Sequence, residues 1–572
     1  MLVRVSRRLL LHGLYLALSL LFATRVFSLR DPGSHAILVG DPALMCSTLQ
    51  WVSHALVHDP RHIFDGNTFY PYPRSIALTD AMVSLAVLNV PVRWFTSNPW
   101  VGYNLLIVAA YYLSCVWGAA LARRITGSEA AGVWGGLFWA FLFFRVHHIA
   151  HLHILSFQAM PAAVLAWLRL RERPAVRSAL VFALAFIAQA LVSWYLAVIL
   201  ATVMVVVALG RPVAARPAIP RWRLAGYTAV ALATIALVVA PLALPYAKAF
   251  SDSSLIERNA LVDTFGDAVS WRDYLTPPAA TMAGRLIAGN PYWIWEENTL
   301  YIGFVPLILS AVAISAAVRR RVSRRWTAIG LALAVVGCVL ALGFVSPRLG
   351  IPLPLHYLAR ALPFLAGMRA TQRFSLVLYM GVLILSSLGI WHLARLVRPR
   401  LAHVMTAALC GLFLIEVFPV VLPVDPATRY VVSAPDQFIA DLQRQREAPL
   451  IVLHLPIFYF REAYPVSEAV YMLDSTAHWA RILNGFSGGV PEGFMARMEV
   501  LNTLPSVRAV NIVLSLSVEV IALHGTAARD GPGSVAEFFA NQPWSTVTRL
   551  PNGDAVVVVD RAAAPFEIKD LR

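Results

Sequence analysis

Two acidic residues near the start of the chain could act as general bases. Asp41 lies in Gly40-Asp41-Pro42, and Asp65 lies in Phe64-Asp65-Gly66-Asn67-Thr68-Phe69-Tyr70-Pro71. A carboxylate that accepts the proton of a hydroxyl group turns that hydroxyl into a nucleophile. The alternative is structural, because Asp often caps helices and Asp-Gly is a common turn pair. Residue type and spacing alone favour the structural interpretation of both acids.

A second candidate group is the histidine-rich segment that runs from Arg145 to His153 and continues to Gln158. On a helix, His148 and His151 would share one face, and so would His147 and His151. Three interpretations stay open: a metal site, hydrogen bonds to a phosphate or a sugar, or a belt of rings at a membrane interface. No Cys or acid lies nearby to complete a metal site of at least three protein ligands. We therefore assign no residue to a metal.

A third group combines cations and aromatic rings. Arg369 and Arg373 lie four residues apart, and the arginine fork pairs well with phosphate oxygens. Side chains that only reach lipid headgroups would have the same composition. Glu297 follows an aromatic cluster whose rings could stack on a sugar, although an interfacial belt predicts the same rings.

The composition indicates what must position these groups. The chain has 572 residues, of which 59% are hydrophobic and 14% are charged. Soluble proteins carry about 25% charged residues, and a membrane-spanning helix needs about 20 mostly apolar residues. The sequence predicts eleven such spans, near 9–28, 101–122, 130–146, 153–168, 178–194, 195–210, 224–246, 299–318, 327–345, 374–394 and 404–422.

The connections between these spans predict the orientation. Short connections rich in arginine alternate with longer ones that hold most of the acids, and the densest cluster lies at 319–325. Positive charge marks the cytoplasmic side, so the N-terminus is expected inside and, with an odd number of spans, the C-terminus outside. The net charge of +16 follows from these loops, which argues against a nucleic-acid partner.

We expect a helical membrane domain over 1–422 and a soluble α/β domain over 423–572 on the non-cytoplasmic side. The first external loop covers 29–100 and includes a helix near 76–95 that lies in the outer interface. The second external loop covers 247–298. Short apolar runs at 450–455 and 556–559 predict strands, Pro551-Asn552-Gly553-Asp554 predicts a hairpin turn, and 535–541 predicts a short helix.

The order of these motifs resembles the GT-C superfamily of membrane glycosyltransferases, in a bacterial branch. The matching segments are Gly40-Asp41-Pro42, Phe64 to Pro71, Arg145 to Pro161, Ser193-Trp194-Tyr195, Tyr301-Ile302-Gly303, Arg369 with Arg373-Phe374, Ser475 to Trp479, and Asn484 to Gly488. The resemblance covers nearly the whole chain.

The resemblance implies an inverting transfer of a hexose or a pentose from a polyprenyl-phosphate donor to an acceptor in the cell envelope, at the bacterial inner membrane. It assigns the catalytic base to Asp41. Related enzymes often have a second acid beside the first, whereas Pro42 and Ala43 follow Asp41 here, so a divalent metal stays open as a cofactor. The residues assigned to substrate binding are Asp65, Tyr70, His148, His151, Gln158, Glu297, Arg369 and Arg373.

Two other classes of function compete with this one. A flippase or exporter of lipid-linked saccharides would need a polar path between the helices, but the spans hold few ionisable groups, Glu416 being the clear exception. A non-catalytic envelope assembly protein would bind a partner through its outer domain and would tolerate the loss of Asp41.

Overall fold

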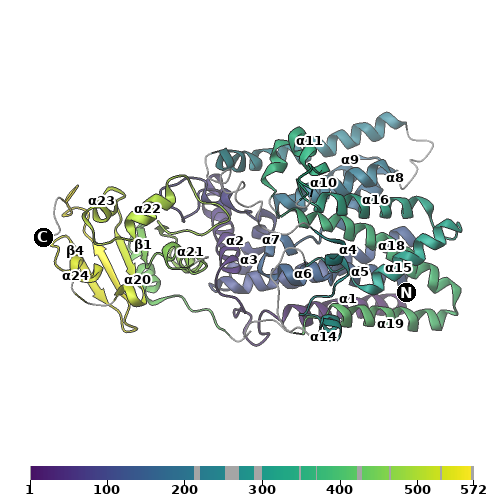
Figure 1. Cartoon of the computed structure of the whole chain (residues 1–572), viewed down its shortest axis with the longest axis horizontal. Helices are drawn as coiled ribbons and strands as arrows, with labels where there is room; N and C mark the ends of the chain where they lie inside the picture. Colours follow the sequence, from purple (N-terminus) through teal and green to yellow (C-terminus); the bar gives the residue numbers. More distant parts are fainter. Residues whose placement is uncertain are drawn as a thin grey trace. The chain divides into compact units, whose positions relative to one another are not determined.

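The computed structural model describes residues 2–210, 220–251, 269–288, 299–346, 349–368, 370–420, 428–462, 465–528, 531 and 533–568. They form two compact units (Figure 1). The helical unit takes its described residues from Met1–Phe27, Asn104–Leu242 and Asn259–Pro426. The α/β unit takes them from Ser28–Tyr103, Ala243–Arg258 and Ala427–Arg572. The α/β unit therefore contains the first predicted external loop as well as the C-terminal segment.

The helical unit is a bundle. Its longer helices are α1 (Leu2–Ala23), α4 (Pro99–Thr126), α5 (Glu129–Ala140), α8 (Met160–Glu172), α9 (Val176–Ala190), α10 (Trp194–Leu209), α11 (Arg221–Ser251), α15 (Phe304–Val318), α16 (Arg324–Ala341), α18 (Ser375–Leu396) and α19 (Pro399–Val417). The ends of α4 and α11 extend into the α/β unit. Shorter helices of the bundle are α13 (Trp271–Leu275), α14 (Met282–Ala288) and α17 (Pro354–Ala361).

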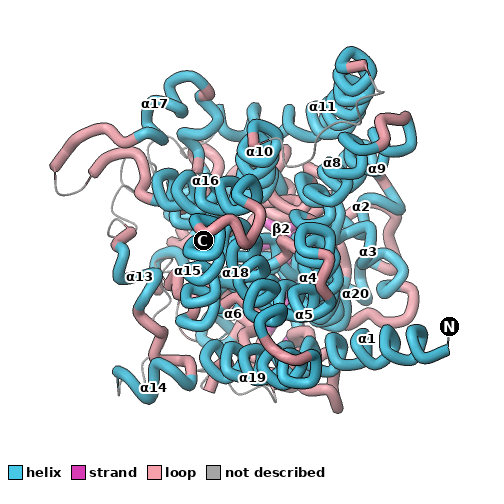
Figure 2. Tube along the Cα trace, turned by 90° about the vertical axis from the view of Figure 1, so that its right-hand side faces the viewer, coloured by secondary structure: helices cyan, strands magenta, loops and turns pink. Residues whose placement is uncertain are grey.

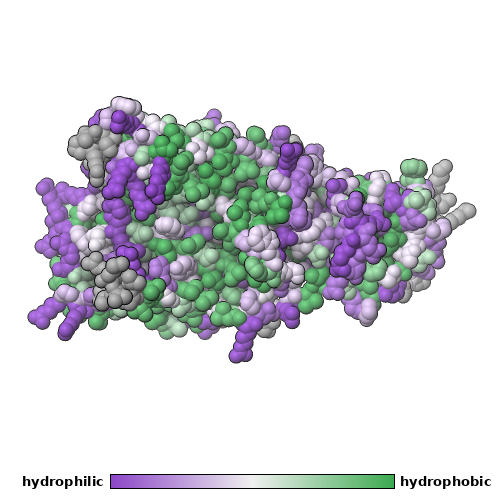
Figure 3. Space-filling view, turned by 180° about the vertical axis from the view of Figure 1, so that it is seen from behind, coloured by the Kyte–Doolittle hydropathy of each residue, from purple (hydrophilic) through white to green (hydrophobic). Residues whose placement is uncertain are grey.

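Each of the eleven predicted spans overlaps one of these longer helices. Six helical segments among the described residues are long and apolar enough to cross a membrane: Pro99–Thr126, Glu129–Ala150, Arg221–Ala249, Arg324–Ala341, Thr371–Leu396 and Pro399–Val417. Leu184, Leu209 and Leu237 are 67%, 76% and 76% exposed, and Figure 3 shows a largely apolar surface over the helical unit. This surface is typical of contact with lipid. The crossing number of eleven stays a prediction.

Helix α18 forms the centre of the bundle. Figure 2 shows it among α15, α16 and α5, and all its residues from Ser375 to Ile390 are buried. Small residues allow the close approach. A Cβ on Gly381 would meet the backbone of Gly330, and a Cβ on Gly389 would meet the backbone of Leu309. Helices without a hydrophobic driving force between them associate through such glycine contacts.

The α/β unit is built on a five-stranded sheet with the order β2-β1-β3-β5-β4. The strands are β1 (Ile451–Leu455), β2 (Arg481–Ile482), β3 (Val520–Leu523), β4 (Ser545–Arg549) and β5 (Ala555–Val559). β1 runs parallel to both β2 and β3, whereas β5 is antiparallel to β3 and β4. The predicted hairpin is confirmed, because Leu550 N donates to Asp554 O at 2.9 Å between β4 and β5.

The α-helices of this unit pack against the sheet or against one another. They are α2 (Asp41–His58), α3 (Val83–Arg93), α20 (Ala434–Gln443), α21 (Glu468–Asp474), α22 (Phe494–Leu501), α23 (Val507–Ser515) and α24 (Val535–Ala540). The helix predicted near 76–95 is shorter than expected, since α3 begins only at Val83. Helix α2 begins at Asp41, which agrees with the structural interpretation of Asp41 as a residue at a helix start.

The first-loop segment from Asn67 to Tyr70 pairs with the chain at and beyond β2. Ile482 N donates to Asn67 O at 2.7 Å, Tyr70 N to Ile482 O at 3.0 Å, and Phe69 N to Asn484 O at 3.0 Å. The Asn67 side chain also donates to Ser475 Oγ and Ala480 O. The segment therefore covers the edge of the sheet, whose backbone groups would otherwise need other partners.

We expect Gly485→Ala to destabilise the α/β unit, because its Cβ would lie 2.5 Å from the Phe69 ring. Overpacking of this kind costs about 1–3 kcal/mol. Thermal unfolding of the detergent-solubilised protein should begin at a lower temperature than in wild type. Gly531→Ala is the matched control, because a Cβ there meets nothing within 4 Å. Equal unfolding temperatures for the two variants would contradict the packing described here.

Candidate functional site

Asp41 is the first residue of α2 and is half-buried. Gly40 precedes it with φ 64°, in the left-handed region that suits glycine, and its N–H donates to Val466 O at 3.1 Å. Pro42 lies in the first helical turn, where a missing N–H costs nothing. Asp41 therefore lies at the N-terminus of a helix, a position that favours negative charge.

Asp65 lies elsewhere in the same unit, in a cavity of about 370 Å³ beside the second half of α2. Its Oδ1 accepts from Arg74 N at 2.8 Å. Arg481 lines this cavity and also lies 5.8 Å above the Tyr70 ring. The other lining residues are Trp51, His54, Ala55, His58, Asp59, His62, Gly66, Asn67, Pro449 and Trp479. Asp41 does not line the cavity. It is the first residue of α2, whereas the cavity lies beside the other end of this helix, which is about 27 Å long.

The cavity wall combines aromatic rings and a neutral histidine. The His54 ring stacks on Trp479 with centroids 4.2 Å apart, and the Arg93 guanidinium lies 5.0 Å from the Trp479 ring centre. Burial and the neighbouring Arg93 charge lower the pKa of His54 to about 4. This wall can therefore form stacking contacts and neutral hydrogen bonds.

The histidine segment of the helical unit is not one continuous helix, so the helical spacing used to group its rings was wrong. It contains the short helices α6 (Phe143–His147) and α7 (Leu152–Leu155), with the 3-10 turn His148–Ala150 between them. Arg145 makes this break stable. Its fully buried guanidinium donates to the carbonyls of Trp139, Ala140 and Leu155 and to Ser114 Oγ. Arg145 thus donates hydrogen bonds to backbone carbonyls that have no donor within the interrupted helices.

The histidine rings still form a series. The centroids of His148 and His151 are 5.9 Å apart, and those of His151 and His153 are 5.8 Å apart. His148 Nδ1 donates to Phe144 O at 2.8 Å, which fixes its tautomer. Gln158 is buried, and its Oε1 has no hydrogen-bond partner among the described residues. The segment therefore gathers polar groups within an apolar bundle.

Two further motifs meet at Arg373. Its guanidinium lies 4.7 Å from the ring centre of Tyr195, and the Tyr195 hydroxyl accepts from Ala370 N at 3.3 Å. A stacked arginine keeps a fixed plane, which favours bidentate recognition of phosphate. Arg369 and Glu297 lie outside the described residues.

Glu416 has a structural partner set. Its carboxylate accepts from the Tyr301 hydroxyl and from the backbone N–H groups of Phe304 and Val305, at the start of α15. An acid at this position satisfies N–H groups that have no partner within the helix. The motif Tyr301-Ile302-Gly303 and Glu416 thus together hold the start of one helix.

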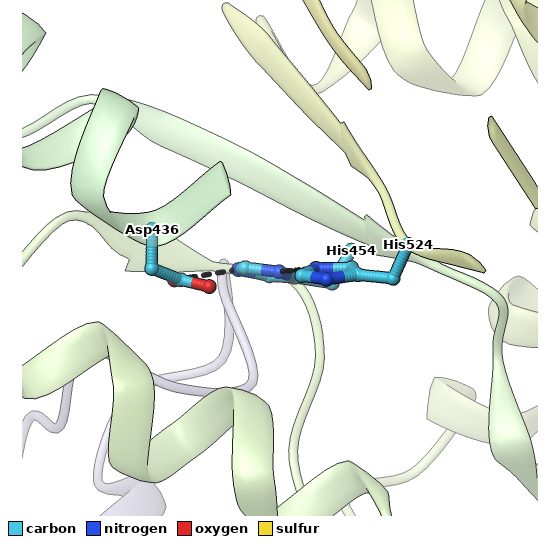
Figure 4. Close-up of side chains that lie close together, drawn as sticks. All are labelled: Asp436, His454 and His524. Atoms are coloured by element: carbon cyan, nitrogen blue, oxygen red, sulfur yellow. Dashed lines mark hydrogen bonds and ion pairs between the residues drawn. The ribbon is translucent and has the colours of Figure 1, made fainter. Parts of the chain in front are cut away.

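The sequence analysis missed a buried cluster in the α/β unit. Figure 4 shows Asp436 from α20, His454 from β1 and His524 just beyond β3, with dashed contacts joining them in a row. A carboxylate oxygen and one ring nitrogen of each histidine lie within 4.8 Å of one another. Burial lowers the pKa of His454 to about 3, whereas the neighbouring histidines lower the pKa of Asp436. In the sequence, the feature that points to this cluster is His454, a polar residue inside the apolar run Ile451–Leu455.

The predicted site residues divide between the two units. Asp41, Asp65 and Tyr70 belong to the α/β unit, whereas His148, His151, Gln158 and Arg373 belong to the helical unit. Their roles in binding and catalysis stay predictions.

We expect Arg145→Met to destabilise the helical unit, because three buried carbonyls lose their donors. Each unsatisfied buried group costs about 1–3 kcal/mol. Less protein should survive solubilisation as a monodisperse species in size-exclusion chromatography. Arg177→Met, at an exposed position of α9, is the control. A fully stable Arg145 variant would contradict the structural role.

The family described as "Domain of unknown function (DUF6311)" matches residues 12–417. No curated protein matches the chain in sequence. The fold is similar to that of the arabinofuranosyltransferase AftD from Mycobacteria, with a TM-score of 0.55 and 12% identity, covering 96% of this chain and 41% of AftD. The chain thus spans less than half the length of AftD.

The oligosaccharyltransferase AglB from Archaeoglobus fulgidus is also similar, in a complex with an inhibitory peptide and a dolichol-phosphate. The TM-score is 0.43 at 12% identity, covering 97% of this chain and 75% of AglB. Its apo form gives a TM-score of 0.43 at 13% identity, with 89% and 69% covered. The similarity to AftD supports the GT-C fold that the motif order predicts. The chain belongs to the DUF6311 family.

Proposed function

We propose that this protein is a glycosyltransferase that moves a sugar from a polyprenyl-phosphate donor to an acceptor on the outer side of a bacterial cytoplasmic membrane. One observation carries the proposal: 96% of the chain aligns with the fold of AftD, a protein named as an arabinofuranosyltransferase. The apolar helical unit supports a donor whose lipid tail stays in the membrane. The acceptor would be an envelope glycan, lipid or protein.

In this proposal Asp41 is the base. Its carboxylate accepts the proton of the acceptor hydroxyl while that oxygen attacks the anomeric carbon, and the polyprenyl phosphate leaves with the electron pair of the broken bond. A single attack from the opposite side inverts the anomeric centre. Support comes from the place of Asp41 as the first residue of α2, because a helix N-terminus favours negative charge.

Arg373 is the proposed partner of the donor phosphate. Charge grows on the phosphate as the glycosidic bond breaks, so a fixed cation stabilises the transition state more than the bound donor. The stacking of Arg373 on Tyr195 supports this role, because it limits the orientation of the guanidinium. His148, His151 and Gln158 would orient the donor through hydrogen bonds. The cavity beside Asp65 and Tyr70 would bind part of the acceptor.

We expect Asp41→Asn to lower transfer about a hundred- to ten-thousandfold, the usual contribution of a general base. The measurement is the transfer of radiolabel from a polyprenyl-phosphate hexose or pentose in membranes that contain equal amounts of each protein. Asp31→Asn is the control, because Asp31 lies in the same loop and its Oδ1 accepts from Gly33 N in a local turn. Wild-type transfer by the Asp41 variant would exclude Asp41 as the base.

A further inference from the structure

The cluster in the α/β unit is placed by the sheet. β1 and β3 are parallel neighbours, and Leu455 pairs with Leu523 at their ends. His454 precedes Leu455, and His524 follows Leu523, with its N–H bonded to Leu455 O at 2.9 Å. Ligands of α/β sheets commonly bind outside the carboxyl ends of parallel strands. The two rings meet there, with His454 Nδ1 and His524 Nε2 3.1 Å apart and the ring planes 20° from parallel.

A carboxylate lies at each end of this histidine pair. His454 Nε2 is 3.7 Å from Asp436 Oδ1, and His524 Nδ1 is 4.0 Å from Asp554 Oδ2. His454 is fully buried, and its Nε2 has no hydrogen-bond partner among the described residues. Asp436 is equally buried, and its ion-pair partners among the described residues are histidines rather than arginine or lysine. Asp436 accepts hydrogen bonds from Ser433 Oγ and from His478 Nε2, but no lysine or arginine among the described residues pairs with its charge.

The protons of the two rings do not suffice for these contacts. Two neutral imidazoles carry one N–H each, but the row has three gaps: carboxylate to ring, ring to ring, and ring to carboxylate. A proton shared between the rings leaves one outer nitrogen with a lone pair facing a carboxylate. A metal ion at the cluster removes this conflict, because the lone pairs then face a cation and the His524 N–H can point to Asp554. Metal-bound histidines usually donate their other N–H to a carboxylate or carbonyl in this way.

We propose that the α/β unit binds one divalent zinc-type ion at the cluster of Asp436, His454 and His524, each of which offers one ligand atom within 4.8 Å of the others, with Asp554 as the carboxylate partner of the His524 ring. Nitrogens bound to zinc at 2.0–2.1 Å in a tetrahedral site lie about 3.3 Å apart, close to the 3.1 Å between His454 Nδ1 and His524 Nε2. A small rotation of the rings directs both lone pairs at the ion.

His478 is excluded as a ligand by its tautomer. Its Nδ1 accepts from Ala480 N at 3.0 Å, so its Nε2 carries the proton and donates to Asp436 Oδ1 at 3.0 Å. His478 therefore orients the carboxylate. The ion would enter from the side of His524, whose side chain is 17% exposed whereas that of His454 is 0% exposed. Water or a substrate oxygen would fill the remaining positions on that side.

The test is the zinc content of the full chain, purified through a tag without histidines, loaded with Zn²⁺ and desalted. We expect one zinc per chain in wild type and none in His454→Gln or His524→Gln. His403→Gln, at an exposed position of α19, should keep its zinc. Asp554→Asn should keep the stoichiometry while its affinity for Zn²⁺ in titration calorimetry falls about ten- to hundredfold, as for other partners of metal-bound histidines.

The comparison requires that the variants are folded. Thermal unfolding of each metal-free variant, measured with a chelator present, shows whether it is folded. If His454→Gln does not fold, the test rests on His524→Gln, at the more exposed end of the site. A wild-type chain without zinc would overturn the proposal, as would a folded His524 variant that retains it. Neither result would bear on glycosyl transfer, which is measured with Asp41→Asn.

Discussion

The pairing of Asn67–Tyr70 with the chain from Ile482 to Asn484 is the contact on which the α/β unit depends. It joins segments more than 400 residues apart, and it covers the edge of a sheet that starts with a strand of two residues. Strands this short have few hydrogen bonds of their own, so the pairing is needed to keep their register. The absence of a side chain at Gly485 allows Phe69 to reach the core beside Phe494.

This contact also explains why the first loop has a defined structure. A loop of about seventy residues would have a large conformational entropy, but α2, α3 and the paired segment order nearly half of it. The positions of Asp41 and Asp65 both depend on the ordered structure of this loop. Asp41 is the first residue of α2, and Asp65 lies in the segment that follows the helix. The proposed base and the cavity residue are therefore positioned by the same packing.

In the helical unit, buried charges support the backbone. Arg145 donates to carbonyls where a helix is interrupted, and Glu416 accepts from N–H groups where a helix begins. In an apolar environment each unsatisfied backbone group costs several kcal/mol, so these two charges stabilise the fold. Neither marks a path for ions or substrates, which weakens the case for a transporter.

The sequence predicted the features that depend on local patterns. Each of the eleven apolar segments overlaps a helix, and the hairpin at Pro551–Asp554 and the strand at Ile451–Leu455 were predicted from periodicity and turn residues. The structural interpretation of Asp41 predicted a helix start there, and Pro42 in the first turn of α2 is a known start signal, but the extent of α2 was not predicted. The break at His148 depends on Arg145 reaching distant carbonyls, which no local pattern reveals.

The cluster of Asp436, His454 and His524 was hidden for a related reason. Its members are 18 and 70 residues apart: the pairing of β1 with β3 brings His454 and His524 together, and Asp436 comes from α20, which packs on β3. Likewise, the contact between Arg373 and Tyr195 joins two motifs that the sequence could only place in order.

The central claim is that the protein binds a lipid-linked phosphate as its donor. The most direct measurement is electron cryomicroscopy of the purified protein with polyprenyl phosphate bound. We expect density for the phosphate group against the guanidinium of Arg373, beside the Tyr195 ring. Density for the phosphate at another place in the helical unit, or no bound lipid at saturating concentration, would contradict it.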